Sequence, residues 1–262
     1  MNDLYKSFHE FFEIVIADTN ELLEIAYSVR YQVLCVEKRL PGFDASLYPD
    51  KLEKDNYDNH SSHFLIRFRP TGDFIGTARL IMFNPLQPEN LFPIELYGQL
   101  DPALCDLKTL PRQRTAEISR FVIVNQFDQR KADRRDHGTE RMNENSIARE
   151  RRSMDRRCAP HLALLLAAGI VRLCAKQNIS YWLSVMDPAL NRLLGYYGLN
   201  LNPIGPIVNY HGLRRPYFAK VEDVLNRMHK EHHDAWEVVT ECGKYNSFLV
   251  THRKVLEREA VS

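Results

Sequence analysis

Residues 117–124, with the sequence EISRFVIV, place an acid, a hydroxyl and a base at the head of a strand whose second half is apolar. Alternate side chains of an extended strand share a face, so Glu117 and Ser119 are expected on one face and Arg120 on the other. Charged groups in the centre of a sheet are costly unless they are paired. The segment therefore predicts a functional site in a buried strand, with a surface ion pair at a strand end as the alternative.

Composition narrows the class of protein. The chain has 262 residues, of which 44% are hydrophobic and 26% charged, enough for the core of one large or two small domains. Its net charge of +1 gives no overall attraction to nucleic acid or to an anionic membrane. The five cysteines are widely spaced and form no Cys-x-x-Cys pair. This disfavours a disulfide framework or a structural zinc site and favours a reducing, cytoplasmic location.

The sequence predicts no transmembrane segment and no metal site. Its longest apolar run, Leu162 to Val171, is about half of the roughly 20 residues that span a bilayer, and we expect it to be a core helix. The acidic, aromatic start of the chain has no basic region of the kind that opens a signal peptide. His229, His232 and His233 lie in a polar tail, where a solvated helix face is expected rather than a metal cluster.

Apolar periodicity and turn residues divide the chain into strands interleaved with helices, which indicates a mixed α/β or α+β sheet. Thr19 or Asn20 caps a first long helix that ends by Pro41, and the turn at 70–73 predicts a hairpin. The expected order is strand 12–18, helix 20–40, strands 63–69 and 74–83, an excursion over 84–114, strand 117–124, helix 160–176, strand 181–186, helix 188–197, extended segments 204–210 and 216–221, and a mostly helical tail.

Residues 130–157 form a strongly charged segment with ten Arg or Lys and six Asp or Glu. Only three residues of this segment are Ile, Leu, Val, Phe or Met, so it cannot bury a face and is predicted to be a flexible basic insertion. It also lacks the interleaved aromatics that stack on RNA bases, and its acids dilute the positive charge. Nucleic acid is therefore not the expected partner.

Four short motifs, in order along the chain, resemble the acyl-homoserine-lactone synthases and the related N-acyl amino acid synthases of the GNAT acyltransferase superfamily. They are Arg30 on the first long helix, Asp55 and Asp58 before the hairpin, Gly76-x-x-Arg79-Leu80 in its second strand, and Glu117-x-Ser119-Arg120-Phe121. The later segments Met186-Asp-Pro and His211-Gly-Leu-Arg-Arg-Pro216 resemble the acyltransferases associated with exosortase and PEP-CTERM sorting systems. The resemblance reaches about residue 220.

The resemblance implies a GNAT-like acyltransferase fold, a central twisted mixed β-sheet flanked by helices. The domain is expected over residues 1–222, followed by a mostly helical extension over 223–262. It also implies an N-acyltransferase (EC 2.3.1.-) with no bound cofactor, which takes a fatty acyl group from a phosphopantetheine thioester and gives it to a small amine.

Two departures from the family pattern bear on the substrates. Leu34 and Leu40 stand where the lactone synthases have aromatics of the S-adenosylmethionine pocket, so a sulfonium would lose its cation–π partners. An amino-acid-like acceptor is therefore favoured, with a lactone synthase as the alternative. Acetyl-CoA enzymes of this superfamily also carry a glycine-rich pyrophosphate turn after the buried strand, whereas here that place is taken by the basic insertion, in which Gly138 is the one glycine. Acyl carrier protein is thus the favoured donor over acyl-CoA, and the 130–157 segment would steer this acidic partner, unless it is only a solvated loop.

The resemblance also assigns roles to site residues. Glu117 is the candidate base, with a pKa raised by burial and opposed by nearby arginines; the alternative is that it only fixes those arginines. Ser119 and Arg120 complete the catalytic set, Ser119 as a hydrogen-bonding partner of the thioester or else as a small packing residue. The expected substrate-binding residues are Arg30, Asp55, Asp58, Arg79 and Phe121.

Several alternatives stay open at this stage. The arginines are expected to form an ion-pair network with Asp55 and Asp58 that orders a loop over the acceptor pocket; either aspartate could instead receive the acceptor's ammonium. Arg30 could also be a helix surface residue. Arg214 and Arg215 are expected to be solvated rather than to bind a carboxylate. From another class of protein, the fold could serve as a non-catalytic module that binds acylated carrier protein.

Overall fold

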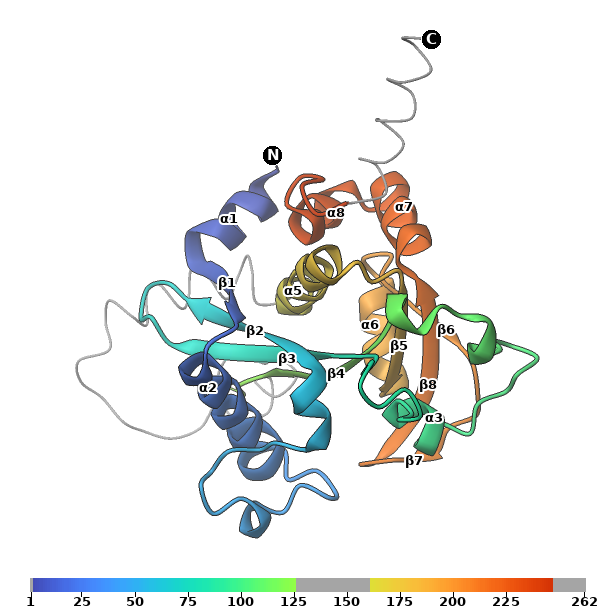
Figure 1. Ribbon diagram of the computed structural model, residues 1–262. Coiled ribbons are helices and arrows are strands. Elements are labelled where there is room, and N and C mark those ends of the chain that lie inside the picture. Colours follow the sequence, from blue (N-terminus) through green and yellow to red (C-terminus); the bar gives the residue numbers. More distant parts are fainter. Residues whose placement is uncertain (1, 126–160, 247–262) are drawn as a thin grey trace, which may run out of the picture.

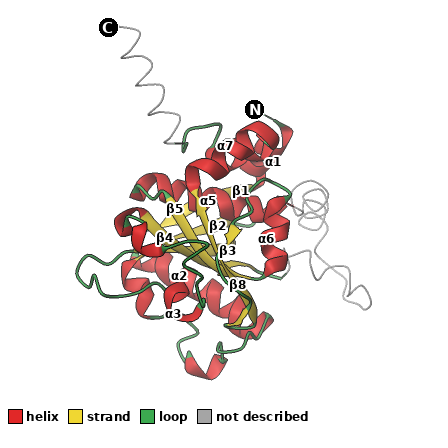
Figure 2. Cartoon of the chain, turned by 90° about the vertical axis from the view of Figure 1, so that its right-hand side faces the viewer, coloured by secondary structure: helices red, strands yellow, loops and turns green. Residues whose placement is uncertain are grey.

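The computed structural model describes residues 2–125 and 161–246, and an eight-stranded sheet forms its centre (Figure 1). The strands follow the order β1-β2-β3-β4-β5-β8-β6, and the short β7 pairs with β8. All pairs are antiparallel except β4 with β5. Figure 2, turned by 90°, shows the yellow strands enclosed by helices. The predicted fold class, a mixed sheet flanked by helices, is confirmed.

The N-terminal half supplies the first four strands. Its elements are α1 (Asp3–Phe11), β1 (Phe12–Ala17), α2 (Asn20–Tyr31) with the π-helical continuation η1 (Gln32–Glu37), β2 (Ser61–Phe68), β3 (Phe74–Met82), α3 (Pro93–Tyr97) and β4 (Thr115–Ile123). The predicted N-cap of the second helix is Thr19, whose side chain accepts a hydrogen bond from the amide of Leu22. The predicted hairpin of β2 and β3 is confirmed.

The C-terminal half carries α5 (Leu162–Gln177), β5 (Tyr181–Met186), α6 (Pro188–Gly195), β6 (Asn202–Pro203), β7 (Val208–Asn209), β8 (Leu213–Lys220), α7 (Val221–Glu231) and α8 (His233–Thr240). The apolar run predicted as a core helix is α5, which packs on β2 and β3 opposite α2 (Figure 1). A Cβ on Gly169 would lie 2.2 Å from the ring of Phe64, so glycine permits this close approach.

Three elements differ from the sequence prediction. The start of the chain forms α1, capped by Asn2, because its apolar residues face α8 rather than a strand. The extended segment 204–210 narrows to the two-residue β7, and the strand 216–221 begins earlier, at Leu213. The basic segment 130–157 lies outside the described residues, as does the tail after 246. No helix of the described parts is long and apolar enough to cross a membrane.

The centre of the sheet opens between β4 and β5. These two parallel strands pair only at the start, where Thr115, Ala116 and Glu117 lie opposite Tyr181, Trp182 and Leu183. Beyond Glu117 the two strands form no further ladder, and the side chain of Ser184 donates a hydrogen bond to the carbonyl of Ile118 at 3.1 Å. Parallel strands that separate in this way leave space at the middle of the sheet.

A bulge in β4 changes the expected arrangement of its faces. The register with β3 shifts between Thr77 and Arg79, and Arg120 adopts φ +53°, in the left-handed region. Strict alternation would send Ser119 and Arg120 to opposite faces. Instead, both side chains reach one group of charges, because the bulge turns Arg120 toward the partners of Arg79. The predicted alternation is therefore wrong beyond Ser119.

Candidate active site

A cavity of about 330 Å³ lies where β4 and β5 separate. Its polar part is lined by the β4 residues Glu117, Ser119 and Arg120, by Asp55 and Arg79, and by Tyr210, His211 and Arg214 from the β7–β8 hairpin. Its apolar part is lined by Ala167 and Ile170 of α5, Met186 of β5, Leu190 and Leu194 of α6, and Leu199 and Leu201. One space thus joins a charged end to an end suited to a hydrocarbon chain.

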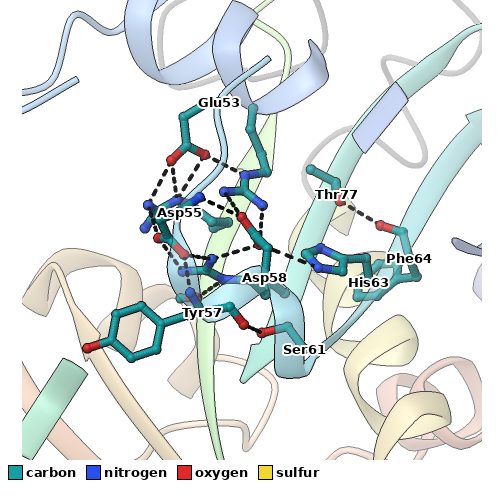
Figure 3. A network of polar contacts seen from close by, with 12 residues as sticks. Glu53, Asp55, Tyr57, Asp58, Ser61, His63, Phe64 and Thr77 are labelled. Carbon is teal, nitrogen blue, oxygen red and sulfur yellow. Dashed lines mark hydrogen bonds and ion pairs between the residues drawn. The ribbon is translucent and has the colours of Figure 1, made fainter. Parts of the chain in front are cut away.

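The charged end contains a network of three arginines and three acids (Figure 3). Arg30 donates from Nε to Glu53 at 2.5 Å and from both Nη atoms to Asp58. Arg79 donates to Asp55 and Asp58 at 2.6 and 2.7 Å, and Arg120 to Glu53 and Asp55 at 2.8 and 2.9 Å. Three positive and three negative groups give a neutral cluster, which is the arrangement that buried charges require.

The predicted network is therefore present, with one member that the sequence reasoning missed. Glu53 is fully buried and bridges Arg30 and Arg120. Its local sequence, Lys-Leu-Glu-Lys, carries no motif. The signal was the charge balance: three arginines against two aspartates left one cation without a partner, so a third acid was required nearby.

The arginines hold the network acids ionised. Burial raises the pKa of Glu53, but Arg30 and Arg120 outweigh it and lower the value to about 2. Burial likewise opposes ionisation of Asp58, while Arg30 and Arg79 bring its pKa well below the ordinary value. Asp55 and Asp58 also cap the short turn at 56–60 through each other's backbone amides. These contacts fix the loop that precedes β2.

His63 closes the network from β2. Its Nε2 lies 3.5 Å from Asp58, and its ring meets that of Tyr27 edge-on. Burial first, and then the positive charge of Arg30, lower its pKa to about 3, so the ring is neutral. The imidazole therefore adds no fourth cation to the cluster.

The predicted substrate-binding residues separate into two groups. Asp55, Arg79 and Phe121 line the cavity, together with the predicted catalytic residues Glu117, Ser119 and Arg120. Arg30 and Asp58 are buried behind them and do not line the cavity. Arg30 is thus no surface residue, and its contacts are those of a group that holds the network together.

Glu117 stands apart from the network in its chemistry. It is 2% exposed, and its Oε2 accepts a hydrogen bond from the amide of Ile94 at 2.8 Å. Burial raises its pKa to about 8 despite the opposing effects of the Ile94 amide and of Arg79 and Arg120. No arginine of the described residues donates to it, so the alternative that Glu117 fixes the arginines is wrong. Glu53, Asp55 and Asp58 do so instead.

Ser119 lies between the network and the cavity. Its Oγ accepts a hydrogen bond from Nε of Arg79 at 3.0 Å. Accepting this bond uses one of the two lone pairs of the hydroxyl and leaves its hydrogen and its second lone pair available. Ser119 also lines the cavity.

Aromatic rings from two distant segments line the wall beside Arg120. Phe43 lies under the guanidinium of Arg120, at 4.8 Å, and against the ring of His211, at 4.6 Å. Tyr210 contacts His211 and stacks on Tyr97 of α3. Leu34 and Leu40 also line the cavity, but they are not aromatic. The aromatic rings of the cavity wall therefore come from other positions in the chain. No local pattern predicted this wall, because it is made by tertiary contact between a loop and a hairpin.

Arg214 is also found at the cavity, although solvation was expected for it. Among the described residues, its guanidinium makes a long hydrogen bond to the carbonyl of His211, at 3.4 Å, and lies 3.9 Å from Asp187. In the described part of the chain it has no close carboxylate partner of the kind that Arg79 and Arg120 have. Its neighbour Arg215 does not line the cavity and donates to the carbonyl of Gly205. The two adjacent arginines therefore have different surroundings.

Comparison with known families agrees with the predicted class of protein. Residues 29–135, which include the network and β4, match the family described as the acetyltransferase (GNAT) domain. The match supports the predicted class of enzyme, an acyltransferase. Comparison with curated protein sequences gives no match.

Solved structures show the same fold. BjaI, a CoA-dependent acyl-homoserine lactone synthase solved with MTA, superimposes with a TM-score of 0.53 and 17% identity, over 88% of this chain and 99% of BjaI. MesI, also a CoA-dependent acyl-homoserine lactone synthase, gives a TM-score of 0.51 and 17% identity, over 83% of this chain and 94% of MesI. TofI, in a ternary complex with an inhibitor and MTA, gives a TM-score of 0.50 and 17% identity, over 83% of this chain and 96% of TofI. At these identities the likeness establishes the fold.

Proposed function

We propose that this chain is an N-acyltransferase that moves a fatty acyl group from the thioester of acyl carrier protein to the amine of an amino-acid-like acceptor. The observation that carries the proposal is Glu117, a buried carboxyl with a pKa of about 8, at the point where β4 and β5 separate and beside an apolar pocket. A primary amine must lose a proton before it can attack a thioester, and a base with a pKa near the working pH serves that step.

The division of the cavity supports the choice of an acyl donor. The leucines of the pocket, with Ala167, Ile170 and Met186, would hold the hydrocarbon chain, and the gap between β4 and β5 would admit the thioester arm. The hydroxyl of Ser119, held by Arg79, would donate to the thioester oxygen or to the departing sulfur as charge develops there. Arg120 would add positive charge at the same wall.

Arg214 supports an acceptor that carries a carboxylate. It is the cavity-lining arginine that the ion-pair network leaves out, and its contact with Asp187 is long and partly exposed. A guanidinium can bind a carboxylate with two parallel hydrogen bonds. An amino acid would place its amine toward Glu117 and its carboxylate toward Arg214.

The Phe43–Tyr210–His211 wall supports a second candidate. A sulfonium acceptor such as S-adenosylmethionine needs aromatic faces, and BjaI is a lactone synthase solved with SAM and isopentyl-CoA. Leu34 and Leu40 weigh against this acceptor, since they replace the aromatics of the lactone synthases. A lactone product is therefore a distinct outcome of the test below.

The test is turnover by the purified chain. Palmitoyl-acyl carrier protein or palmitoyl-CoA is supplied with a mixture of the common L-amino acids, or with S-adenosylmethionine, and products are identified by mass spectrometry. We expect N-acyl amino acids, formed faster from the carrier protein, and none with Glu117→Gln. A lactone would replace the proposed acceptor, and faster turnover of palmitoyl-CoA would replace the donor. Binding of acyl carrier protein without any product would indicate a non-catalytic module.

Arg214 and Arg215 offer a matched pair for the acceptor. We expect Arg214→Ala to lose about tenfold or more in kcat/KM for amino acids but little for the corresponding carboxamides, because only the acids carry the charge that the guanidinium binds. Arg215→Ala serves as the control and should leave both values near those of the wild type. An equal loss on acids and amides would remove the carboxylate from the proposal.

A further inference from the structure

His211 occupies a constrained position at the tip of the β7–β8 hairpin. Its φ is +54°, a left-handed conformation that a residue with a Cβ adopts only when its surroundings require it, and Gly212 follows at +102°. The amide of Tyr210 donates across this turn to the carbonyl of Gly212 at 2.9 Å. The turn presents the imidazole to the cavity, which it lines.

The loop at 41–43 is shaped around one edge of the ring. Nδ1 of His211 lies 2.7 Å from the carbonyl oxygen of Pro41. A Cβ on Gly42 would lie 2.7 Å from Nδ1 and 2.8 Å from Cε1, and Gly42 has φ +84°, so only glycine fits there. Phe43 then packs on the ring face. These contacts hold the imidazole in one orientation.

The Pro41 contact also fixes the tautomer. A carbonyl oxygen can only accept, so Nδ1 carries the hydrogen and, in the neutral ring, Nε2 carries a lone pair. Burial lowers the pKa of His211, as do Arg120 and Arg214, while the Pro41 bond and Glu53 act in the opposite direction. The neutral form therefore prevails at neutral pH. Among the described residues none hydrogen-bonds to Nε2, and the ring lines the cavity.

We propose that His211 is a second proton acceptor of the active site, whose Nε2 receives a proton from the acceptor's nitrogen after the C–N bond has formed. This inference rests on the proposed acyl transfer to an amine. It assigns the two protons of the reaction to two groups: Glu117 for the proton that the ammonium loses before attack, and His211 for the proton that the nitrogen loses after attack.

The steps balance with these two groups. The ammonium gives one proton to the Glu117 carboxylate and becomes a neutral amine. Its nitrogen bonds to the thioester carbon, and the positively charged nitrogen passes a proton to Nε2 as the C–S bond breaks. The imidazolium returns that proton to the departing thiolate. The products are an amide and a free thiol, His211 is neutral again, and Glu117 releases its proton to solvent. A base of lowered pKa suits this role, because it gives the proton up readily.

Substitution of His211 by asparagine distinguishes the role of Nδ1 from the role of Nε2. Its amide N–H can replace Nδ1–H as the donor to Pro41, and asparagine tolerates the left-handed φ, but it has no atom at the place of Nε2. We expect His211→Asn to keep the wild-type melting temperature and KM and to lose roughly 100-fold in kcat, within the usual range for a general acid–base residue. His211→Gly also suits φ +54° and leaves room for free imidazole, which should restore part of the lost kcat.

Each outcome of this experiment decides the inference. Activity of His211→Asn within threefold of wild type, with the fold intact, would show that the ring only holds the 41–43 loop. A loss of kcat in both variants with no rescue of His211→Gly by imidazole would also overturn a proton-accepting role. Failure of the wild-type chain to acylate any amine would overturn the proposed function itself, and the role of His211 with it.

Discussion

Two kinds of acid lie at or behind the cavity, and they respond to burial in opposite ways. Glu53 and Asp58, behind the cavity, are surrounded by guanidinium groups, which lower their pKa values despite burial. Glu117, on β4, lines the cavity; within the described residues its hydrogen-bond partner is the Ile94 amide, and burial raises its pKa to about 8. The arginines are close enough to act on Glu117 but donate no hydrogen bond to it.

The difference shows how one fold gives buried carboxyls different pKa values. Burial alone raises the pKa of every acid, and direct pairing with arginine decides which acids stay ionised. Glu53, Asp55 and Asp58 take up the arginine donors, and the pKa of Glu117 stays raised. The network thus occupies the cations that would otherwise pair with Glu117 and lower its pKa.

Substitution of Glu117 should give the largest effect on activity. Glu117→Gln keeps an oxygen that can accept from the Ile94 amide but removes the basic carboxylate, so we expect turnover to fall by about 10²–10⁴-fold with the fold retained. Steady-state kinetics with circular dichroism as a folding control would measure this. Turnover within a few-fold of wild type would assign the base elsewhere.

Substitution within the network should instead affect stability. Glu53→Gln leaves Arg30 and Arg120 without their shared carboxylate, and we expect a loss of about 3–5 kcal/mol in the free energy of unfolding. Urea denaturation measures it. The adjacent exposed pair of Lys54 with Asp50 provides the control, because Lys54→Met should cost less than about 1 kcal/mol. Equal costs at the two positions would contradict the buried network.

The two kinds of acid should give pH dependences of opposite sign. The pKa of Glu53 is lowered on folding, so its stabilisation is present above about 4.5 and is lost as pH falls toward 2. The pKa of Glu117 is raised, so wild type loses stability as pH rises from 4.5 to about 8. The free energy of unfolding of Glu117→Gln should therefore rise relative to that of wild type over this pH range, by on the order of 3 kcal/mol at its upper end.

Denaturation curves measured at pH 5 and pH 8 would test the Glu117 half of this prediction. A constant difference between Glu117→Gln and wild type across the range would mean that the carboxyl titrates alike in the folded and unfolded chains.

Ser119→Ala should give the smallest effect. It removes a hydroxyl that lines the cavity and accepts from Arg79, whose other nitrogens keep their bonds to Asp55 and Asp58. We expect a fall in kcat of about tenfold or less and a stability change of about 1 kcal/mol. Ser119 lies between the network acids and Glu117. An unchanged kcat would mean that its hydroxyl serves the ion-pair network and takes no part in the reaction.

Local pattern predicted most of the fold. The hairpin of β2 and β3, strand β5 and the helix opened by Asp187 and Pro188 each have signals within a few residues, and each was found. Helix α1 was missed because its aromatic residues face α8, more than 200 residues later in the chain. The bulge at Arg120 was missed for a similar reason, since it arises from the register between two strands.

The site was predictable where residue type and motif coincide. Arg79, Arg120 and Glu117 were found from short motifs, and the network was expected from their charges. Glu53 and His211 were not found, because their roles depend on contacts made by a loop and a hairpin tip. Nothing local to Gly42 indicated that a histidine 169 residues later would need its missing Cβ.

The network also has a consequence for the order of folding. Glu53 and Arg120 are 67 residues apart in sequence, and Asp58 and Arg30 are 28 apart, so these contacts close long loops whose entropy is lost before any ion pair forms. The 41–60 loop is therefore expected to dock after the hairpin and β4 have come together. Weakening the network should then mainly speed unfolding and leave the folding rate nearly unchanged, so the lifetime of the folded chain depends on a cluster of charges beside its cavity.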